Sequence, residues 1–318
     1  MTLRDPYPII TPAEVAPVGR GPFWRPGDIV TWTFRRFDFD RDLAEVARPM
    51  RVIADGPDGA ALWLAGGTPT QETRIVGWEE TNAHDVPLKA RFRPLAEAPT
   101  RINVDGTWRG RGVLKIVPAQ VPFSVWVLLK DDASGPSGPG DGGETGAGAR
   151  PAGGRSAGAR PAGGRSAGAR SSGVRAEWYV NLEATHRRNR GTLFTSDHIL
   201  DITFPVATLP LHTADGGLDA SGAVFKDVDE LAAAANFGAW PAEWSEAIRA
   251  NGAHLLEHLD EYRWAFDPVW EATARALADE ALVDETLADE AQPDREASTG
   301  ARVEHAPNTE DLMKGTVP

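Results

Sequence analysis

The 318-residue chain carries a net charge of -13, and its 41% hydrophobic content is enough to fill one core. It has no cysteine, which excludes disulfide bonds, thiolate zinc sites and cysteine nucleophiles, so any metal must be held by oxygen or imidazole. No stretch approaches the ~20 apolar residues of a membrane span, and the N-terminus lacks a secretory pattern, so we expect a cytoplasmic protein that does not bind membranes.

The charged residues are unevenly distributed. Residues 271–318 carry twelve acids and four bases, whereas residues 133–176 carry two acids and six arginines. The rest of the chain remains acidic, which argues against binding to duplex nucleic acid. Acids gathered in a cleft would instead recruit a divalent cation, which then supplies the positive charge that a phosphate needs.

Composition divides the chain into four segments. Residues 133–172 are rich in Gly, Ala, Arg and Pro and contain the tandem repeat ARPAGGRSAG, so we expect a disordered insertion that joins two parts of one domain, 1–132 and 173–270. Binding of RNA by the insertion is the less favoured alternative. Residues 271–318 are expected to form an acidic, mostly disordered tail that opens with a frayed helix.

Short β-branched and aromatic runs bounded by Gly, Pro and Asp predict strands. Their spacing favours a mainly β protein built as an antiparallel β-barrel, with the insertion placed between the sixth and seventh strands. The predicted strands are Asp28–Phe34, Arg51–Ala54, Ala61–Leu64, Arg101–Val104, Val113–Val117, Phe123–Leu129, Trp178–Leu182 and Ile199–Val206.

Two helices are predicted after the strands. The first covers about Val228–Asn236 and ends at Gly238, where glycine supplies a left-handed exit. The second opens at Pro241 and places an apolar stripe against the barrel. That stripe consists of Trp244, Ile248, Leu255, Leu259 and Tyr262, and Phe266 and Trp270 are expected to close the core.

The run WYVNLE at 178–183 alternates between apolar and polar side chains. Strand geometry sends Tyr179, Asn181 and Glu183 to the face opposite Trp178 and its apolar partners. An amide, a carboxylate and a phenol on one face suit metal binding or base stacking. They equally suit an ordinary solvated sheet face, and the run alone leaves both open.

Asp197 and Asp201 share the second candidate strand and, by alternation, one face with Ile199 and Thr203. Acids are poor strand residues, so two on one face indicate either charge protection of a sheet edge or metal binding. On a flat strand the two would lie roughly 13 Å apart at ~3.3 Å per residue, so one ion can contact both only across a bend, a bulge or a bridging water. The alternative is that the two acids bind two separate ions.

Asp227 and Glu230 open the first predicted helix. Their spacing matches a capping box, which alone would account for both acids; alternatively the helix start fixes the two carboxylates toward the strand acids. Between the strands lie three arginines and a histidine at 186–190. Arginine suits phosphate through its bidentate fork, although a turn decorated with arginine is an equally good explanation.

These residues, in order and spacing, resemble the DUF402 family, the superfamily of the fosfomycin-pathway hydrolase of a cytidylyl phosphonate ester and of a bacterial nucleoside tri- and diphosphatase. The resemblance is carried in the C-terminal half by WYVNLE at 178–183, Arg188, Gly191, DHILD at 197–201 and KDVDEL at 226–231. In the N-terminal half it is looser, resting on GDIV at 27–30, RPMRVI at 48–53 and a strand pair around Leu114 and Val125.

The resemblance implies an antiparallel barrel with C-terminal helices and a divalent ion, Mg²⁺ or Mn²⁺. Carried over by position, the metal ligands would be Asn181, Asp197, Asp201, Asp227 and Glu230. The nucleotidase branch places a further acid where this chain has Ile199, a departure that implies one tightly held ion or a different substrate. That branch also uses an N-terminal arginine as proton donor, for which Arg48 is the nearest match.

The sequence therefore predicts a metal-dependent hydrolase of a nucleotide-type phosphate or phosphonate ester, acting by direct attack of water. Asp197 or Asp229 is the expected base, and the expected substrate-binding residues are Tyr179, Arg188 and Lys226. The alternative from another class is a non-catalytic accessory protein that binds a nucleotide or RNA. The oligomeric state is not predicted.

Overall fold

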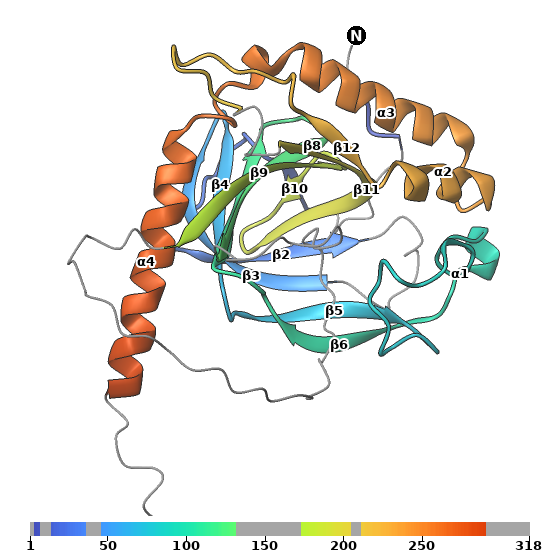
Figure 1. The fold of residues 1–318 in the computed structure, drawn as a ribbon, viewed down its shortest axis with the longest axis horizontal. Helices are drawn as coiled ribbons and strands as arrows, with labels where there is room; N and C mark the ends of the chain where they lie inside the picture. Colours follow the sequence, from blue (N-terminus) through green and yellow to red (C-terminus); the bar gives the residue numbers. More distant parts are fainter. Residues whose placement is uncertain (1–2, 7–13, 36–45, 132–172, 205–210, 291–318) are drawn as a thin grey trace, which may run out of the picture. The chain divides into compact units, whose positions relative to one another are not determined.

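The computed structural model describes five stretches of the chain: residues 3–6, 14–35, 46–131, 173–204 and 211–290 (Figure 1). The predicted insertion, 133–172, and residues 291–318 of the predicted tail lie outside them. The chain divides into two compact units, Met1–Asp279 and Glu280–Pro318. Within the described residues, no helix is both long and apolar enough to cross a membrane.

The first unit is built on a large sheet and a small one. The large sheet has the order β1-β10-β11-β2-β3-β4-β7-β8-β9, and β12 pairs with β11. Its strands are β1 (Ala16–Pro17), β2 (Ile29–Arg35), β3 (Val46–Gly56), β4 (Gly59–Ala65), β7 (Gly112–Pro118), β8 (Phe123–Asp131), β9 (Val174–Glu183), β10 (Arg187–Arg188), β11 (Thr192–Phe204) and β12 (Val224–Lys226). The small sheet pairs β5 (Pro69–Ile75) with β6 (Arg101–Thr107).

The large sheet closes on itself. β9 pairs with β11 as well as with β8, so that β2, β3, β4, β7, β8, β9 and β11 form a closed ring. Strand direction cannot alternate all the way around a ring with an odd number of members. The β2–β11 pair is parallel for this reason, and the expectation of a wholly antiparallel arrangement is wrong at that one pair. The mainly β class is confirmed.

All eight predicted strands coincide at least in part with observed ones. β11 begins at Thr192, earlier than predicted, and β1, β5, β10 and β12 were not predicted. The β8–β9 ladder extends to the pair Asp131 and Val174, so the two ends of the insertion are neighbours in the sheet, as expected for a hairpin.

The helices are α1 (Leu88–Arg91), α2 (Val228–Asn236), α3 (Ala242–Glu257) and α4 (Val269–Glu290), with short 3-10 turns at Leu95–Glu97 and Leu259–Tyr262. The prediction for α2 is confirmed, including Gly238 beyond its end with φ 71°. The second predicted helix stops at Glu257, before Leu259 and Tyr262. α4 opens with Trp270, Ala274 and Ala278 buried in the core, so the predicted boundary at residue 270 falls within a helix.

The ring separates two apolar clusters. One cluster joins Trp178, Val180 and Leu182 of β9 to helical residues, including Leu231 and Ile248. The other cluster lies on the enclosed face and includes Trp32, Trp126 and Tyr179. The predicted alternation of β9 is therefore confirmed.

α2 and α3 run beside β9 and β11 of the ring, and beside β12, which pairs with β11 (Figure 1). Gly252 permits this approach, because a Cβ atom there would lie 2.6 Å from the Phe225 ring and 3.2 Å from Leu182. The start of α2 directly follows β12, whose Lys226 pairs with Asp201 of β11, so the first residues of the helix lie close to the polar residues of β11.

Candidate functional site

A β-bulge in β11 brings Asp197 and Asp201 toward one another. Asp197 pairs with Glu183 and Asp201 with Asn181, so four residues of β11 span only two of β9. Along the sheet the two acids are therefore separated by about 7 Å rather than about 13 Å, at ~3.3 Å per residue. A bulge is one of the three arrangements, besides a bend and a bridging water, by which one ion could contact both acids.

The bulge has a defined local cause. Ile199 adopts a left-handed conformation, with φ 72°, and its N–H donates a 2.7 Å hydrogen bond to Oδ1 of Asp197. The strand period is broken here, and Ile199 joins Leu200 and Ile202 in the core cluster next to the helices. The expectation that Ile199 shares a face with the acids is therefore wrong, and an acid at this position would point elsewhere than the two aspartates.

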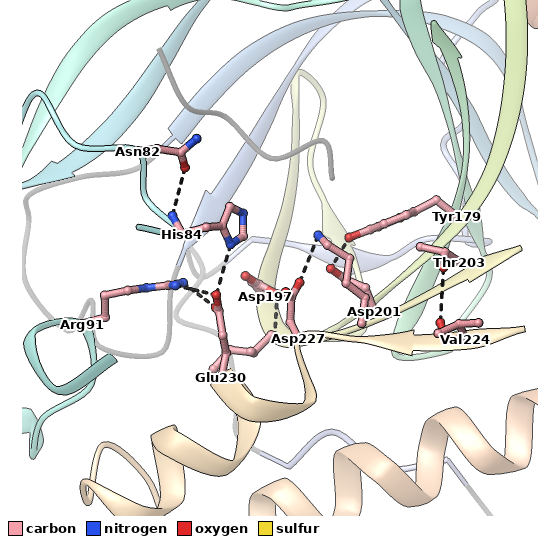
Figure 2. A network of polar contacts seen from close by, with 12 residues as sticks. Asn82, His84, Arg91, Tyr179, Asp197, Asp201, Thr203, Val224, Asp227 and Glu230 are labelled. Atoms are coloured by element: carbon pink, nitrogen blue, oxygen red, sulfur yellow. Dashed lines mark hydrogen bonds and ion pairs between the residues drawn. The ribbon is translucent and has the colours of Figure 1, made fainter. Parts of the chain in front are cut away.

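The third strand of the site is β12. Lys226 lies opposite Asp201 on β11, on the side away from Asn181, and Asp227 follows directly. Figure 2 shows the carboxylates of Asp197, Asp201 and Asp227 gathered in one region, with Glu230 on the α2 side. The Lys226 ammonium lies 3.1 Å from Oδ2 of Asp227. The strand acids Asp197 and Asp201 and the helix acids Asp227 and Glu230 thus form one acid group.

The strand part of the group is almost completely buried. Asp201 is 3% exposed, and its Oδ2 accepts a hydrogen bond from the Tyr179 hydroxyl. Asn181 is 2% exposed, and its Oδ1 is buried without a hydrogen-bond partner in the described part of the chain. A buried amide oxygen without a partner costs about 1–3 kcal/mol, so a ligand that accepts its lone pair would recover that cost.

The capping-box explanation of Asp227 and Glu230 is wrong. Asp227 occupies the N-cap position of α2 with φ 61°, but its side chain makes no capping hydrogen bond. Glu230 instead turns toward α1, where Arg91 Nη1 and Nη2 each lie 2.5 Å from one of its oxygens. His84 Nδ1 lies 3.1 Å from Oε1 of the same carboxylate. Burial would raise the pKa of Glu230, but His84 and Arg91 outweigh it and lower that pKa to about 2.

The residues present fit a divalent cation. Asp197, Asp201, Asp227 and Glu230 supply hard carboxylate oxygens and Asn181 an amide oxygen, which are the ligands that Mg²⁺ and Mn²⁺ prefer. When all four acids are ionised, the neighbouring cations Lys226 and Arg91 balance only half of their charge. The remainder equals the charge of one divalent ion.

The other predicted site residues have varied surroundings. Arg48 is buried on β3, with its guanidinium 4.7 Å from the Trp32 ring centre and 5.1 Å from that of Trp108. Arg188 pairs with Asp55, donates to the Pro22 carbonyl at 2.6 Å and stacks 3.8 Å from the Trp24 ring centre.

None of these Arg188 partners belongs to the acid group, so packing accounts for Arg188 without a substrate. Asp229 is exposed on the first turn of α2, whereas Asp197 is 6% exposed. Tyr179 is 3% exposed, and its hydroxyl already holds Asp201, which leaves it poorly placed for the predicted base stacking.

A buried ion pair lies beside the acid group on the enclosed face. Lys115 Nζ is 2.5 Å from Oε1 of Glu183, which stands opposite Asp197 in the ladder. Burial lowers the pKa of Lys115 to about 8, against the raising effect of Glu183. Burial would raise the pKa of Glu183, but Lys115 and His186 lower it to about 2. Burial also lowers the pKa of His198 to about 3, so this histidine is neutral.

Sequence reasoning missed His84, Arg91 and Lys115. His84 and Arg91 lie in a polar stretch without periodicity, and they precede their partner Glu230 by 146 and 139 residues. Lys115 did leave a signal, because a lone lysine in the apolar strand GVLKIVP requires a buried counter-charge. A surface hollow of about 310 Å³ lies elsewhere, along residues 256–261, and includes none of the acid group.

Comparison with known proteins gives the following relatives. No family model matches the chain. The chain is 24% identical over 226 residues to cytidylyl-2-hydroxypropylphosphonate hydrolase of Streptomyces fradiae, covering 71% of this chain and 76% of that protein. It is 23% identical over 225 residues to the protein of the same name from Streptomyces wedmorensis, covering 71% and 75%.

Among solved structures, the chain resembles a phosphatase crystallised with the non-hydrolyzable nucleotide GPCP, with a TM-score of 0.51 and 24% identity. The match covers 78% of this chain and 93% of that one. The two proteins therefore share a fold.

Proposed function

We propose that the chain hydrolyses a nucleotide-type phosphate or phosphonate ester or anhydride, with a divalent cation, Mg²⁺ or Mn²⁺, and by direct attack of water. The observation that carries the proposal is the bulge that gathers Asp197 and Asp201 on the enclosed face, beside the unsatisfied Oδ1 of Asn181. A left-handed isoleucine costs about 1–2 kcal/mol, and such strain is common at functional sites.

The cation would be held by Asn181, Asp197, Asp201, Asp227 and Glu230. The four acids are labelled in Figure 2, and Asn181 stands opposite Asp201 in the β9–β11 ladder. When bound, a divalent ion supplies polarisation of a phosphoryl oxygen and a lowered pKa for a coordinated water. The rest of the chemistry is assigned to side chains of this chain, and no covalent intermediate is required.

Asp197 is assigned as the base that receives the proton of the attacking water, because it is buried within the group while Asp229 is exposed. Tyr179 fixes Asp201 through its hydroxyl. Lys226, beside Asp227, is assigned to phosphate oxygens of the substrate. Arg48 keeps its proton in any protein environment, so we assign it to charge balance and not to proton donation.

The two curated relatives support the substrate class. Both are named as hydrolases of a cytidylyl ester of a hydroxypropylphosphonate, and each match covers three quarters of the relative. A small-molecule nucleotide, and not a duplex, is therefore the substrate class that we propose.

The proposal is tested by turnover of a nucleotide panel by the full chain. Nucleoside diphosphates, nucleoside triphosphates and cytidylyl phosphonate esters would be incubated with Mn²⁺, with Mg²⁺ or with a chelator. We expect hydrolysis that the chelator abolishes, and ¹⁸O from labelled water on a phosphorus-containing product. Asp197→Asn serves as the inactive comparison. Tight nucleotide binding without turnover of any panel member would favour the alternative, a non-catalytic nucleotide- or RNA-binding accessory protein.

A further inference from the structure

His84 lies beside the acid group although it comes from a distant part of the chain. The connection between β5 and α1 carries it to the start of α2 (Figure 2). Its backbone N–H donates a 3.0 Å hydrogen bond to Oδ1 of Asn82, which fixes the turn that presents the ring. One ligand atom each of His84, Asp227 and Glu230 lie within 4.8 Å of one another.

The spacing between His84 and Glu230 suits two ligands of a single ion. Two donor atoms that each lie ~2.1 Å from an octahedral ion are about 3.0 Å apart when adjacent and about 4.2 Å apart when opposite. His84 Nδ1 and Glu230 Oε1 are separated by 3.1 Å, which matches the adjacent arrangement. The His84 side chain is 27% exposed, so an ion and its waters can reach the ring.

The ion pair with Arg91 leaves Glu230 able to bind an ion. A carboxylate offers about four acceptor positions, and the two Arg91 hydrogen bonds occupy one on each oxygen. Ligating carboxylates are commonly held in this way by a second group that fixes their orientation. Oε1 of Glu230 also contacts His84 Nδ1 at 3.1 Å, so an ion bound between the two side chains would replace the hydrogen bond that they share in the metal-free protein.

A separate observation on the strand side also points to a ligand. Asn181 is 2% exposed, stands opposite Asp201, and has an Oδ1 without a hydrogen-bond partner among the described residues. We propose that His84 is a nitrogen ligand of the divalent cation, so that the site combines one imidazole with carboxylate and amide oxygens. The inference rests on the proposed function and adds a preference among metal ions, because imidazole binds transition-metal ions better than it binds Mg²⁺.

The test uses Mn²⁺ alone, added to the metal-free full chain, and pulsed electron paramagnetic resonance. We expect ¹⁴N coupling from a directly bound imidazole, which disappears when the histidines carry ¹⁵N. His84→Asn should abolish this coupling and weaken Mn²⁺ binding by at least about tenfold. Asparagine places an amide N–H near the position of Nδ1, so it retains a donor to Glu230. His254→Asn, on α3 beside His258, is the matched control and should leave the spectrum unchanged.

The preference between ions gives a second readout. Wild-type protein should bind Mn²⁺ more tightly than Mg²⁺, and His84→Asn should reduce the ratio of the two dissociation constants. If the protein binds Mn²⁺ and hydrolyses a substrate but shows no ¹⁴N coupling, the inference is overturned and the proposed function stands. His84 would then be a hydrogen-bond partner of Glu230 and not a metal ligand. Absence of both Mn²⁺ binding and hydrolysis would overturn the two together.

Discussion

Arg91 and Glu230, 139 residues apart in the chain, form a two-pronged ion pair in which each terminal nitrogen lies 2.5 Å from one carboxylate oxygen. The side chains are only 6% and 10% exposed. The contact ties α1 to the first turn of α2, and it replaces the helix cap that the sequence spacing suggested. Glu230 therefore takes part in the stability of the fold as well as in the proposed metal site.

Glu230→Gln should lower both activity and stability. A glutamine accepts one of the two Arg91 hydrogen bonds but leaves the guanidinium without a counter-charge, so we expect a loss of roughly 1–3 kcal/mol in the free energy of unfolding. Loss of a negative ligand should raise the Mn²⁺ requirement and reduce turnover by orders of magnitude. Glu243→Gln, exposed at the start of α3, is the control. Wild-type activity and Mn²⁺ requirement in Glu230→Gln would remove Glu230 from the site.

Asp201→Asn should separate metal binding from folding. The asparagine side chain retains an oxygen that accepts the Tyr179 hydroxyl, and removal of one of several close carboxylates relieves repulsion in the metal-free protein. We therefore expect the melting temperature without metal to remain unchanged or rise, while metal-dependent turnover is lost. Differential scanning calorimetry with and without Mn²⁺ measures both effects. A sharp fall in the metal-free melting temperature, with Mn²⁺ binding retained, would make Asp201 a structural residue.

Much of the fold follows from local patterns. Alternation placed Trp178 and Asn181 on opposite faces, and Gly238 marked the end of α2, because both features depend on a few neighbouring residues. The parallel β2–β11 pair did not follow, since it arises from the number of strands in the closed ring. Polar β5 lacks a strand pattern and, among the strands that the structure describes, pairs only with β6.

In the candidate site, too, some features follow from local sequence patterns and others arise only from the tertiary fold. The sequence places Asp197 and Asp201 on one strand and leaves a bend, a bulge, a bridging water or two ions open, whereas the left-handed Ile199 that forms the bulge is not predicted. His84 and Arg91 contact Glu230 only through the tertiary fold, so no local pattern indicates them. From the sequence alone, a helix-capping role and a metal-binding role for Glu230 are therefore equally well supported.

Ile199 offers a test of the bulge itself. Both Ile199→Ala and Ile199→Gly remove a side chain that is 6% exposed, and should cost roughly 2–4 kcal/mol. In ordinary strand backbone glycine is less stable than alanine by about 0.5–1 kcal/mol. At φ 72° the order should be reversed by about 1 kcal/mol, because only glycine adopts this conformation without strain. Urea denaturation of the two variants measures the difference, and a less stable glycine variant would contradict a left-handed residue here.

Lys115 and Glu183 should show strong coupling. The pair is almost fully buried, at 1% and 0% exposure, with 2.5 Å between Nζ and Oε1. Either Lys115→Met or Glu183→Gln leaves one charge buried without its partner, which typically costs about 3–5 kcal/mol. The double variant removes both charges and should lose at least about 2 kcal/mol less than the sum of the single losses. Additive losses in denaturant titrations would show that the two side chains act independently.

The same pair should set part of the acid sensitivity of the protein. The pKa of Glu183 falls from its ordinary 4.5 to about 2 in the folded protein, so the folded state binds this proton more weakly than the unfolded chain. Its contribution to stability is therefore complete above about pH 4.5 and is lost as the pH falls toward 2. At the other end, burial lowers the pKa of Lys115 from 10.5 to about 8, so stability should rise with pH between those values. The double variant lacks both groups, and its free energy of unfolding should change less than that of the wild type across each interval. Equal slopes for the two proteins in chemical denaturation between pH 2 and 4.5 would show that Glu183 does not carry this dependence.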